Sequence, residues 1–297
     1  MKWYGGIEAG GTKFNCIIAN SPDQILEEAR ISTTTPEETL REVISFFTCA
    51  KSRENITLTS LGVGSFGPID LAPRSPGFGS ITSTPKLAWR NAKILPILNN
   101  ALNIPISFDT DVNAAALGEG KWGAAVGCVN YVYVTIGTGI GGGAVVNGKP
   151  VHGLLHPEMG HLFIPHNWEG DPFSGCCPSH GDCIEGLASG PALLARWGLP
   201  AEQLPSDHPA WKLEAKYLSY FLANIILTIS PERIIMGGGV MKAPGLLDLV
   251  KHELANVLNG YVQNEQILSK IDQYIQYPAL GDKAGALGSI ALAQMKD

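Results

Sequence analysis

T-I-G-T-G-I-G-G-G (Thr135–Gly143) is the most informative segment of this chain for its fold. It follows a near-continuously apolar run at 129–136 and precedes a second apolar segment at 144–146, so the pattern predicts two strands joined by a glycine turn. E-A-G-G-T-K (Glu8–Lys13) repeats this arrangement between strand-like segments at 4–8 and 14–19. The chain therefore uses one device, a strand, a glycine turn and a strand, in two places.

Both turns have a composition that suits phosphate binding. Glycine lets backbone N–H groups come close to an anion, and threonine adds a hydroxyl donor. A hairpin turn needs one or two glycines, whereas Thr135–Gly143 contains five. We therefore interpret both turns as phosphate-binding hairpins. The predicted nucleotide contacts in them are Gly10, Gly11, Thr12, Lys13, Thr138 and Gly139.

Two other nucleotide motifs fit the sequence less well. Gly137, Gly139 and Gly142 formally satisfy G-x-G-x-x-G, but the dinucleotide fingerprint needs a helix to begin there, and the following A-V-V-N-G-K-P is strand-like. The P-loop pattern that ends in G-K-[ST] is absent from the sequence. The two hairpins are therefore the better interpretation.

The composition is that of a folded globular protein of 297 residues, 45% of them hydrophobic. The excess of 27 Asp and Glu over 21 Lys and Arg gives a net charge of −6, which argues against a nucleic-acid partner because phosphate neutralisation needs a basic face. The most apolar helical stretch, 217–229, is too short for a membrane span and contains Asn224. Glu8 lies where a signal peptide would need its apolar region. We expect a cytoplasmic protein that binds neither nucleic acid nor membrane.

Strand and helix patterns alternate along the chain, which predicts an α/β architecture. T-P-E-E supplies an N-cap at Thr35, proline at the first helical position and Glu38 as the partner in a capping box, so a helix begins at Pro36. Further strands are expected at 58–63, 106–108 and 234–236, and further helices at about 91–102, 112–122, 184–197 and 209–229.

Asp109 and Asp111 both lie where a predicted strand ends and a helix begins. Helix capping explains a carboxylate at such a position, and we assign capping or a nearby backbone contact to Asp109. Phosphoryl transfer to an alcohol needs a carboxylate that accepts the hydroxyl proton close to the transferred phosphate. This pair therefore offers a candidate base.

Three of the six cysteines cluster near histidines, a pattern that favours metal binding over a disulfide framework. His161, Cys177, His180 and Cys183 form H-x15-C-x2-H-x2-C, and Zn²⁺ takes four tetrahedral nitrogen or sulfur ligands. Four protein ligands leave no position for water, so the zinc would be structural. Three neighbouring residues remain alternative ligands, namely Cys176, His156 and His166.

Taken together, these segments resemble the ROK family of sugar kinases, which belong to the larger actin-like, hexokinase-like (ribonuclease H-like) ATPase fold. The resemblance rests on E-A-G-G-T-K, D-T-D-V-N-A-A-A-L-G-E, T-I-G-T-G-I-G-G-G, N-G-K, H-P-E-M-G-H and I-I-M-G-G-G-V-M in this order. It covers nearly the whole chain and is strongest to bacterial zinc-containing fructokinases. Thr110 stands where the family usually has Asn, and Glu8 where it often has Asp.

The resemblance implies two lobes and a nucleotide cofactor. One lobe would span 1–110 and be completed by a C-terminal helix at about 284–297. The other would span 111–283 and carry an inserted zinc loop at 156–185. Mg·ATP would lie between the lobes, with Glu8 orienting Mg²⁺-bound water. Relatives are commonly dimers, so we also expect a homodimer.

The resemblance also implies roles for particular residues. Asp111 would be the general base that deprotonates the sugar hydroxyl. The implied sugar contacts are Gly67, Pro68, Thr110, Asp111, Glu158, His161 and Glu185. The implied contacts on the adenine side of ATP are Pro191, Gly237, Gly238, Gly239, Val240 and Met241, where the last five follow a strand and open a helix whose N-terminus suits an anion. The zinc ligands that it selects are His161, Cys177, His180 and Cys183.

We therefore predict ATP-dependent phosphorylation of a hexose, D-fructose to fructose 6-phosphate. Thr110 and the C-P-S-H-G-D-C loop favour fructose over the substrates of other ROK kinases, namely glucose, mannose and N-acetylhexosamines. The alternative from another class is a non-catalytic sugar-sensing protein. A sugar-responsive repressor would carry an N-terminal DNA-binding domain, which we do not expect because the first hairpin begins within ten residues of the N-terminus. Asp111 argues against a catalytically dead module.

Overall fold

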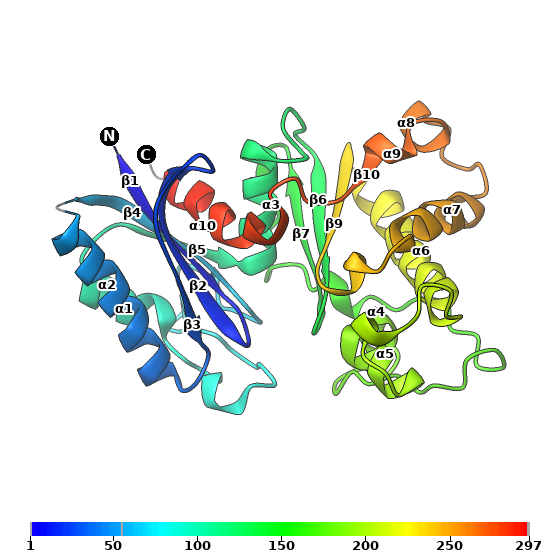
Figure 1. Cartoon of the computed structure of the whole chain (residues 1–297), viewed down its shortest axis with the longest axis horizontal. Coiled ribbons are helices and arrows are strands. Elements are labelled where there is room, and N and C mark those ends of the chain that lie inside the picture. Colours follow the sequence, from blue (N-terminus) through cyan, green and yellow to red (C-terminus); the bar gives the residue numbers. More distant parts are fainter. Residues whose placement is uncertain (1, 55, 296–297) are drawn as a thin grey trace. The chain divides into compact units, whose positions relative to one another are not determined.

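The computed structural model describes residues 2–54 and 56–295, and the chain divides into two compact units (Figure 1). Unit 1 comprises Met1–Gly127, Pro150–Pro157 and Ala279–Asp297. Unit 2 comprises Cys128–Lys149 and Glu158–Pro278. Each unit is built around a five-stranded sheet, as the alternating strand and helix patterns predict.

The sheet of unit 1 has the order β3-β2-β1-β4-β5. β1 pairs antiparallel with β2, which pairs antiparallel with β3, whereas β4 runs parallel to β1 and β5 parallel to β4. The strands are β1 (Trp3–Ala9), β2 (Lys13–Ser21), β3 (Gln24–Ser32), β4 (Leu58–Ser65) and β5 (Ile106–Thr110). The four strands predicted in this unit are confirmed. β3 was not predicted, because this edge strand buries only Ile31 and carries charged residues along its length.

Helices cover both faces of this sheet (Figure 1). α1 (Pro36–Arg53) and α2 (Ile94–Leu102) lie on one face, where Phe14, Phe47 and Leu98 are part of one buried cluster. α1 begins as predicted, because the Thr35 hydroxyl accepts a hydrogen bond from the N–H of Glu38. α2 begins three residues later than predicted, since Asn91 adopts a positive φ of 60° that a helix does not accommodate.

α3 (Asp111–Trp122) and α10 (Ala284–Gln294) lie on the other face and approach each other with almost no side chain between them. A Cβ on Gly288 of α10 would lie 2.0 Å from the carbonyl oxygen of Ala114 in α3. A Cβ on Gly62 of β4 would lie 1.9 Å from the carbonyl oxygen of Ser289. Glycine is therefore required at both positions by close backbone contact.

α3 belongs to unit 1, so the division of the chain differs from the predicted boundary at 110/111. The physical reason is its packing against α10 together with Glu119, whose buried carboxylate accepts hydrogen bonds from the N–H groups of Ala279 and Leu280. These contacts join α3 to the segment that leads into α10. α10 packs against β1, β2 and β4, and the last two residues of the predicted 284–297 helix lie outside the described residues.

The sheet of unit 2 has the order β10-β9-β6-β7-β8. Its strands are β6 (Tyr131–Ile136), β7 (Ile140–Val146), β8 (Lys149–Pro150), β9 (Arg233–Gly237) and β10 (Ile275–Gln276). β6 and β7 form the predicted antiparallel pair around the glycine turn, and β9 runs parallel to β6. The three strands predicted in this unit are thus confirmed.

The helices of unit 2 differ from the prediction over residues 184–197. They are α4 (Ile184–Ala188), α5 (Gly190–Trp197), α6 (Ala210–Ile229), α7 (Leu246–Leu258), α8 (Glu265–Leu268) and α9 (Ile271–Tyr274). The single helix predicted over 184–197 is broken at Ser189, which has an extended backbone and caps α5 by accepting from the N–H of Ala192. Single 3₁₀ turns complete the chain at Leu87–Trp89, Met159–His161, Ala201–Gln203, Val240–Lys242 and Gly281–Lys283.

Within residues 2–54 and 56–295, every helix is too short or too polar to cross a lipid bilayer.

The close contact at Gly288 gives a stability prediction. Gly288→Ala places a methyl group against the backbone of α3, and overpacking of this kind costs about 1–3 kcal/mol in the free energy of unfolding. In an isolated helix, alanine is more favourable than glycine by up to about 1 kcal/mol. A net loss of folding stability in Gly288→Ala therefore has to come from the contact with α3. Urea denaturation measures it, with Gly153→Ala as control because its nearest neighbouring atom is 3.9 Å away. Equal stability of the two variants would contradict the packing argument.

Candidate active site and metal centre

The first glycine hairpin is held in shape by backbone contacts inside unit 1. The N–H of Gly10 donates to the carbonyl oxygen of Lys13 at 2.9 Å, which closes the turn between β1 and β2. Thr33 of the neighbouring segment donates from its hydroxyl to Gly10 at 2.8 Å and from its N–H to Thr12 at 3.1 Å. Hydrogen bonds within the chain therefore fix the turn, and its contact with phosphate stays a prediction.

Glu8 lies just before this turn, on β1. Its carboxylate accepts a hydrogen bond from the Asn15 side chain at 2.7 Å and packs where Gly285 of α10 leaves room for it. Burial raises the pKa of Glu8 above its usual value, and the nearby Asp282 acts in the same direction. Glu8 is thus anchored by a neutral amide, and its contact with Mg²⁺-bound water stays a prediction.

The end of β5 places Asp109, Thr110 and Asp111 on one turn, as the sequence predicts. Thr110 is the N-cap of α3, because its hydroxyl accepts from the N–H of Asn113 at 3.1 Å. Asp109 makes the nearby backbone contact that we assigned to it as the alternative to capping, because it accepts from the N–H of Thr110 at 2.7 Å. Asp111 is the first residue of the helix, and its Oδ1 accepts from the N–H of Val112 at 2.9 Å.

His152 contacts this turn from the segment Pro150–Pro157, and sequence reasoning did not find it. Its Nε2 lies 3.1 Å from Oδ1 and 3.0 Å from Oδ2 of Asp109, which is 3% exposed. Asn113 donates from its side chain to the same Asp109 oxygen at 2.8 Å. The hydrogen bond and the negative charge of Asp109 raise the pKa of His152 above its usual value. Nothing in the sequence near His152 signals this pairing across more than 40 residues.

Gly67 and Pro68 belong to a loop that His156 holds. The ring Nε2 of His156 accepts from the N–H of Ile69 at 3.1 Å, and Thr82 donates to the carbonyl oxygen of Pro68 at 2.7 Å from its N–H. Loss of hydration lowers the pKa of the buried His156. His156, which the sequence left open as a metal ligand, instead positions this loop.

The second glycine hairpin is tied to the helices that follow the Cys/His loop. The carbonyl oxygen of Gly137 accepts from the N–H of Gly190 at 2.8 Å, one residue before Pro191 at the start of α5. The N–H of Ile140 donates to Oε2 of Glu185 at 2.9 Å. Thr138 and Gly139 therefore lie on a turn that is braced on both sides by residues of α4 and α5.

The Gly237–Met241 segment does not open a long helix, which corrects the prediction. After β9 the chain forms a single 3₁₀ turn, Val240–Lys242, and α7 begins only at Leu246. Gly238 has a φ of 95° and packs so closely on Ile136 of β6 that a Cβ would lie 2.2 Å from its carbonyl oxygen. A three-residue turn has little dipole, so any anion contact here depends on individual N–H groups.

The predicted metal ligands His161, Cys177, His180 and Cys183 come together in unit 2. Their donor atoms all lie within 4.8 Å of one another. Nδ1 of His161 is 3.5 Å from Sγ of Cys183 and 3.7 Å from Sγ of Cys177, which is itself 3.7 Å from Nδ1 of His180. In a tetrahedral zinc site with ordinary bond lengths, nitrogen and sulfur ligands are about 3.6 Å apart. The donor set and its spacing therefore fit zinc.

Local backbone structure explains why these four residues meet. Cys177 and Gly181 exchange two backbone hydrogen bonds, which close a tight turn that presents Cys177 and His180 on one side. Gly181 has a φ of 68°, a conformation that glycine adopts readily. Cys183 is the N-cap of α4, and His161 ends the 3₁₀ turn Met159–His161.

Of the remaining alternative ligands, Cys176 and His166 lie outside this cluster. His166 is buried between Asp182, 3.2 Å from its Nδ1, and the carbonyl oxygen of Asp171, 3.0 Å from its Nε2. Asp171 in turn pairs with Arg196 of α5 and accepts from the Tyr217 hydroxyl at 2.6 Å. This network fixes the loop that carries the cluster, and sequence reasoning did not find it.

Glu158 and Glu185 are close enough for their charges to interact. Loss of hydration raises the pKa of Glu158 above its usual value, the charge of Glu185 adds to the rise, and His161 opposes it. A carboxyl pair beside the predicted metal ligands suits recognition of several hydroxyl groups, because carboxylates accept several O–H donors.

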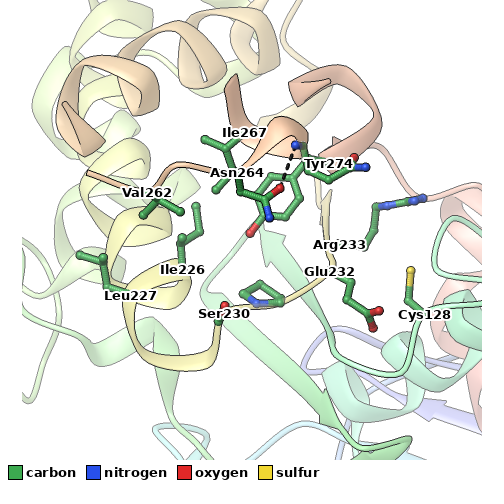
Figure 2. A pocket seen from close by; sticks show the side chains of 12 residues that line it. Cys128, Ile226, Leu227, Ser230, Glu232, Arg233, Val262, Asn264, Ile267 and Tyr274 are labelled. Atoms are coloured by element: carbon green, nitrogen blue, oxygen red, sulfur yellow. Dashed lines mark hydrogen bonds between the residues drawn. The ribbon is translucent and has the colours of Figure 1, made fainter. Parts of the chain in front are cut away.

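A separate pocket of about 580 Å³ lies at the other end of the unit 2 strands. Its lining includes Cys128, just before β6, and Arg233, the first residue of β9, so it lies at the N-terminal ends of these two parallel strands. The glycine residues at 137–143 and 237–239 lie at the C-terminal ends of the same strands. Figure 2 shows apolar side chains on one side of it (Ile226, Leu227, Val262 and Ile267) and Cys128, Glu232 and Arg233 on the other. This pocket is therefore distinct from the predicted nucleotide contacts.

Comparison with known proteins supports the resemblance drawn from the sequence. A family model described as the ROK family matches residues 4–296. This chain belongs to the ROK family. Among ROK relatives, the fructokinase of Zymomonas mobilis is 44% identical over 294 residues, which are 98% of this chain and 96% of that protein. The fructokinase of Lactococcus lactis subsp. cremoris is 44% identical over 292 residues, which are 98% of this chain and 97% of that protein.

A solved ROK structure confirms the predicted fold. The ROK hexokinase from Thermus thermophilus superimposes with a TM-score of 0.79 at 25% sequence identity, over 99% of this chain and 98% of that one. With two mixed sheets and their flanking helices, the chain therefore has the actin-like, hexokinase-like α/β fold.

The Asp109–His152 pair gives a prediction that NMR tests. Because Asp109 raises the pKa of folded His152 above its unfolded value of about 6.5, the pair stabilises the fold fully below that value and loses its effect as pH rises through the folded pKa. Asp109→Asn should lower the titration midpoint of the His152 ring signals. His152→Gln, in which those signals vanish, provides their assignment. An unchanged midpoint in Asp109→Asn would contradict the pairing.

Proposed function

We propose that this ROK protein is an ATP-dependent fructokinase that converts D-fructose to fructose 6-phosphate. The observation that carries the proposal is the 44% identity to curated fructokinases over nearly the full length of both chains. The position of Asp111 supports it, because a carboxylate at the start of a helix can accept a proton from a bound hydroxyl.

Asp111 is the proposed general base. ATP supplies the phosphoryl group, and the chain has to activate the attacking sugar oxygen. The hydrogen bond from the N–H of Val112 orients the carboxylate of Asp111 at the first turn of α3. This carboxylate would accept the hydroxyl proton as the oxygen attacks, while Asp109 is already occupied by three donors.

The proposed sugar contacts come from both units, each considered by itself. Unit 1 would contribute Gly67, Pro68, Thr110 and Asp111, and unit 2 would contribute Glu158, His161 and Glu185. The Thr110 hydroxyl is already the acceptor of an N-cap hydrogen bond, so towards a sugar it would act as a donor. Glu185 has one oxygen engaged by Ile140 and would bind a hydroxyl with the other.

The proposed ATP contacts are those of the glycine turns and of the adenine side. They are Gly10, Gly11, Thr12, Lys13, Thr138, Gly139, Pro191, Gly237, Gly238, Gly239, Val240 and Met241. Mg²⁺ would accompany ATP, as phosphoryl transfer requires, and Glu8 would orient its bound water. The homodimer expected from the family resemblance is a further proposal, which light scattering tests.

We further propose that His161, Cys177, His180 and Cys183 hold a structural zinc ion. Three nitrogen–sulfur distances in the cluster, 3.5, 3.7 and 3.7 Å, are those of a tetrahedral zinc site, and four protein ligands leave no site for water. A bound zinc would fix the loop between Glu158 and Glu185, the two carboxylates proposed to bind sugar.

The assigned base is tested by replacing its carboxylate. Wild-type protein should release ADP with fructose, and Asp111→Asn should lower kcat by about 10²–10⁴-fold, because proton transfer contributes roughly that factor. Coupled ADP assays with fructose, glucose, mannose and N-acetylhexosamines measure both. Asp23→Asn, on an exposed turn, is the matched control and should match the wild type.

Each result of this assay bears on a different part of the proposal. Turnover with glucose or mannose and none with fructose would reject the assigned substrate but keep a ROK hexose kinase. No turnover with any hexose would reject the kinase and favour a sugar-sensing protein. Unchanged kcat in Asp111→Asn would reject the base.

The metal proposal is tested by elemental analysis of purified protein. About one zinc per chain is expected in the wild type, and Cys177→Ser or Cys183→Ser should bring the zinc content close to zero. Cys176→Ser should keep the metal, since this neighbouring residue lies outside the cluster. Zinc loss should also lower the melting temperature. Wild-type protein that contains no zinc after growth with zinc would refute the assignment.

A further inference from the structure

The Asp109 carboxylate has three hydrogen-bond partners. This buried carboxylate accepts from the N–H of Thr110, from the Asn113 side chain and from Nε2 of His152. Since carboxylate oxygens only accept, the proton of the neutral His152 ring lies on Nε2. Asp109 thereby sets both the tautomer and the orientation of the His152 ring.

The other ring nitrogen of His152 is an open acceptor. In the neutral ring, at pH values above the raised pKa of His152, the proton is on Nε2 and Nδ1 carries a lone pair, and the hydrogen bonds of His152 among the described residues all involve Nε2. The side chain is 42% exposed, although the carboxylate that holds it is nearly inaccessible. The His152 ring is therefore held at Nε2 by a buried carboxylate while much of the side chain is exposed to solvent. This arrangement suits contact with a ligand better than packing in a core.

His152 also lies in a segment that reaches two predicted sugar-binding elements of unit 1. Asp109 connects His152 to the turn that carries Asp111, and His156, four residues further on, holds the loop of Gly67 and Pro68. The segment Pro150–Pro157 thus joins the predicted base to the predicted sugar loop within one unit.

We propose that His152 is a sugar-binding residue whose Nδ1 accepts a hydrogen bond from a hexose hydroxyl, and that Asp109 is the positioning residue that holds it. The inference rests on the proposed sugar kinase function and adds a contact to it. The chemistry of the turn selects a hydroxyl over a phosphate, because Asp109 and Asp111 make this turn negative and a lone pair on Nδ1 needs a donor.

Two substitutions separate the two sides of the His152 ring. The amide nitrogen of a glutamine can replace Nε2 and keep the bond to Asp109, but no acceptor replaces Nδ1. The side chain of an asparagine can replace Nδ1 but does not reach Asp109. His152→Gln should therefore raise KM for the hexose about ten-fold, the loss expected for one hydrogen bond to a ligand, and leave KM for ATP unchanged. His152→Asn should raise KM for the hexose less.

Deoxy-hexoses identify the hydroxyl involved. Removing the contacted hydroxyl should raise KM in the wild type, and the same removal should cost little in His152→Gln, because the partner is already absent. Circular dichroism checks that both variants are folded. The inference is overturned if His152→Gln has the wild-type KM for the hexose, or if His152→Asn is the more impaired variant, since that order indicates a purely structural bond to Asp109.

Calorimetric titration of the hexose keeps this inference separate from the proposed function. A protein that binds hexose without turning it over would refute the kinase, yet His152→Gln should still lose about ten-fold in affinity. Turnover and binding that both survive in His152→Gln would refute the sugar contact alone.

Discussion

The backbone contact of α10 with α3 and the unit 1 sheet is the constraint on which the geometry of this unit depends. Gly62, Gly118 and Gly288 let these elements approach to distances that no side chain allows. Two buried hydroxyls complete the contact, since Ser60 donates to Ala293 and Ser289 donates to Ile7. With α3 fixed along its length, its first turn is held at the end of β5, and Asp109 and Asp111 acquire defined positions.

In unit 2, hydrogen bonds to residues of α4 and α5 fix the second glycine turn. The turn between β6 and β7 is braced by Glu185 at Ile140 and by the N–H of Gly190 at Gly137. Both braces lie just after Cys183, the last residue of the Cys/His cluster. A metal ion bound by this cluster would therefore also restrain the second glycine turn. The proposed metal site and the proposed phosphate contacts of unit 2 are linked in this way.

Most of the strands and the clustering of His161, Cys177, His180 and Cys183 could be predicted from the sequence because their signals are local. Apolar runs bounded by glycines locate β1, β2, β6 and β9, and the short spacing of Cys177, His180 and Cys183 lets one loop present all three. β3 was missed because an edge strand needs few apolar residues, and the break at Ser189 was missed because a capped turn can interrupt a helical pattern. The network of Asp171, Arg196 and Tyr217 joins distant segments, so no local pattern could reveal it.

Local sequence patterns do not distinguish the two aspartates at the end of β5, Asp109 and Asp111. They are identical in chemistry and two residues apart, and their roles differ only through what surrounds each one. Asp109 is buried and contacts three hydrogen-bond donors, whereas Asp111 is the first residue of α3 and accepts from the N–H of Val112. The donor that completes the set around Asp109 is His152, 43 residues away along the chain. Because only the folded chain brings that donor to the turn, the fold and not the motif determines how differently the two carboxylates are surrounded.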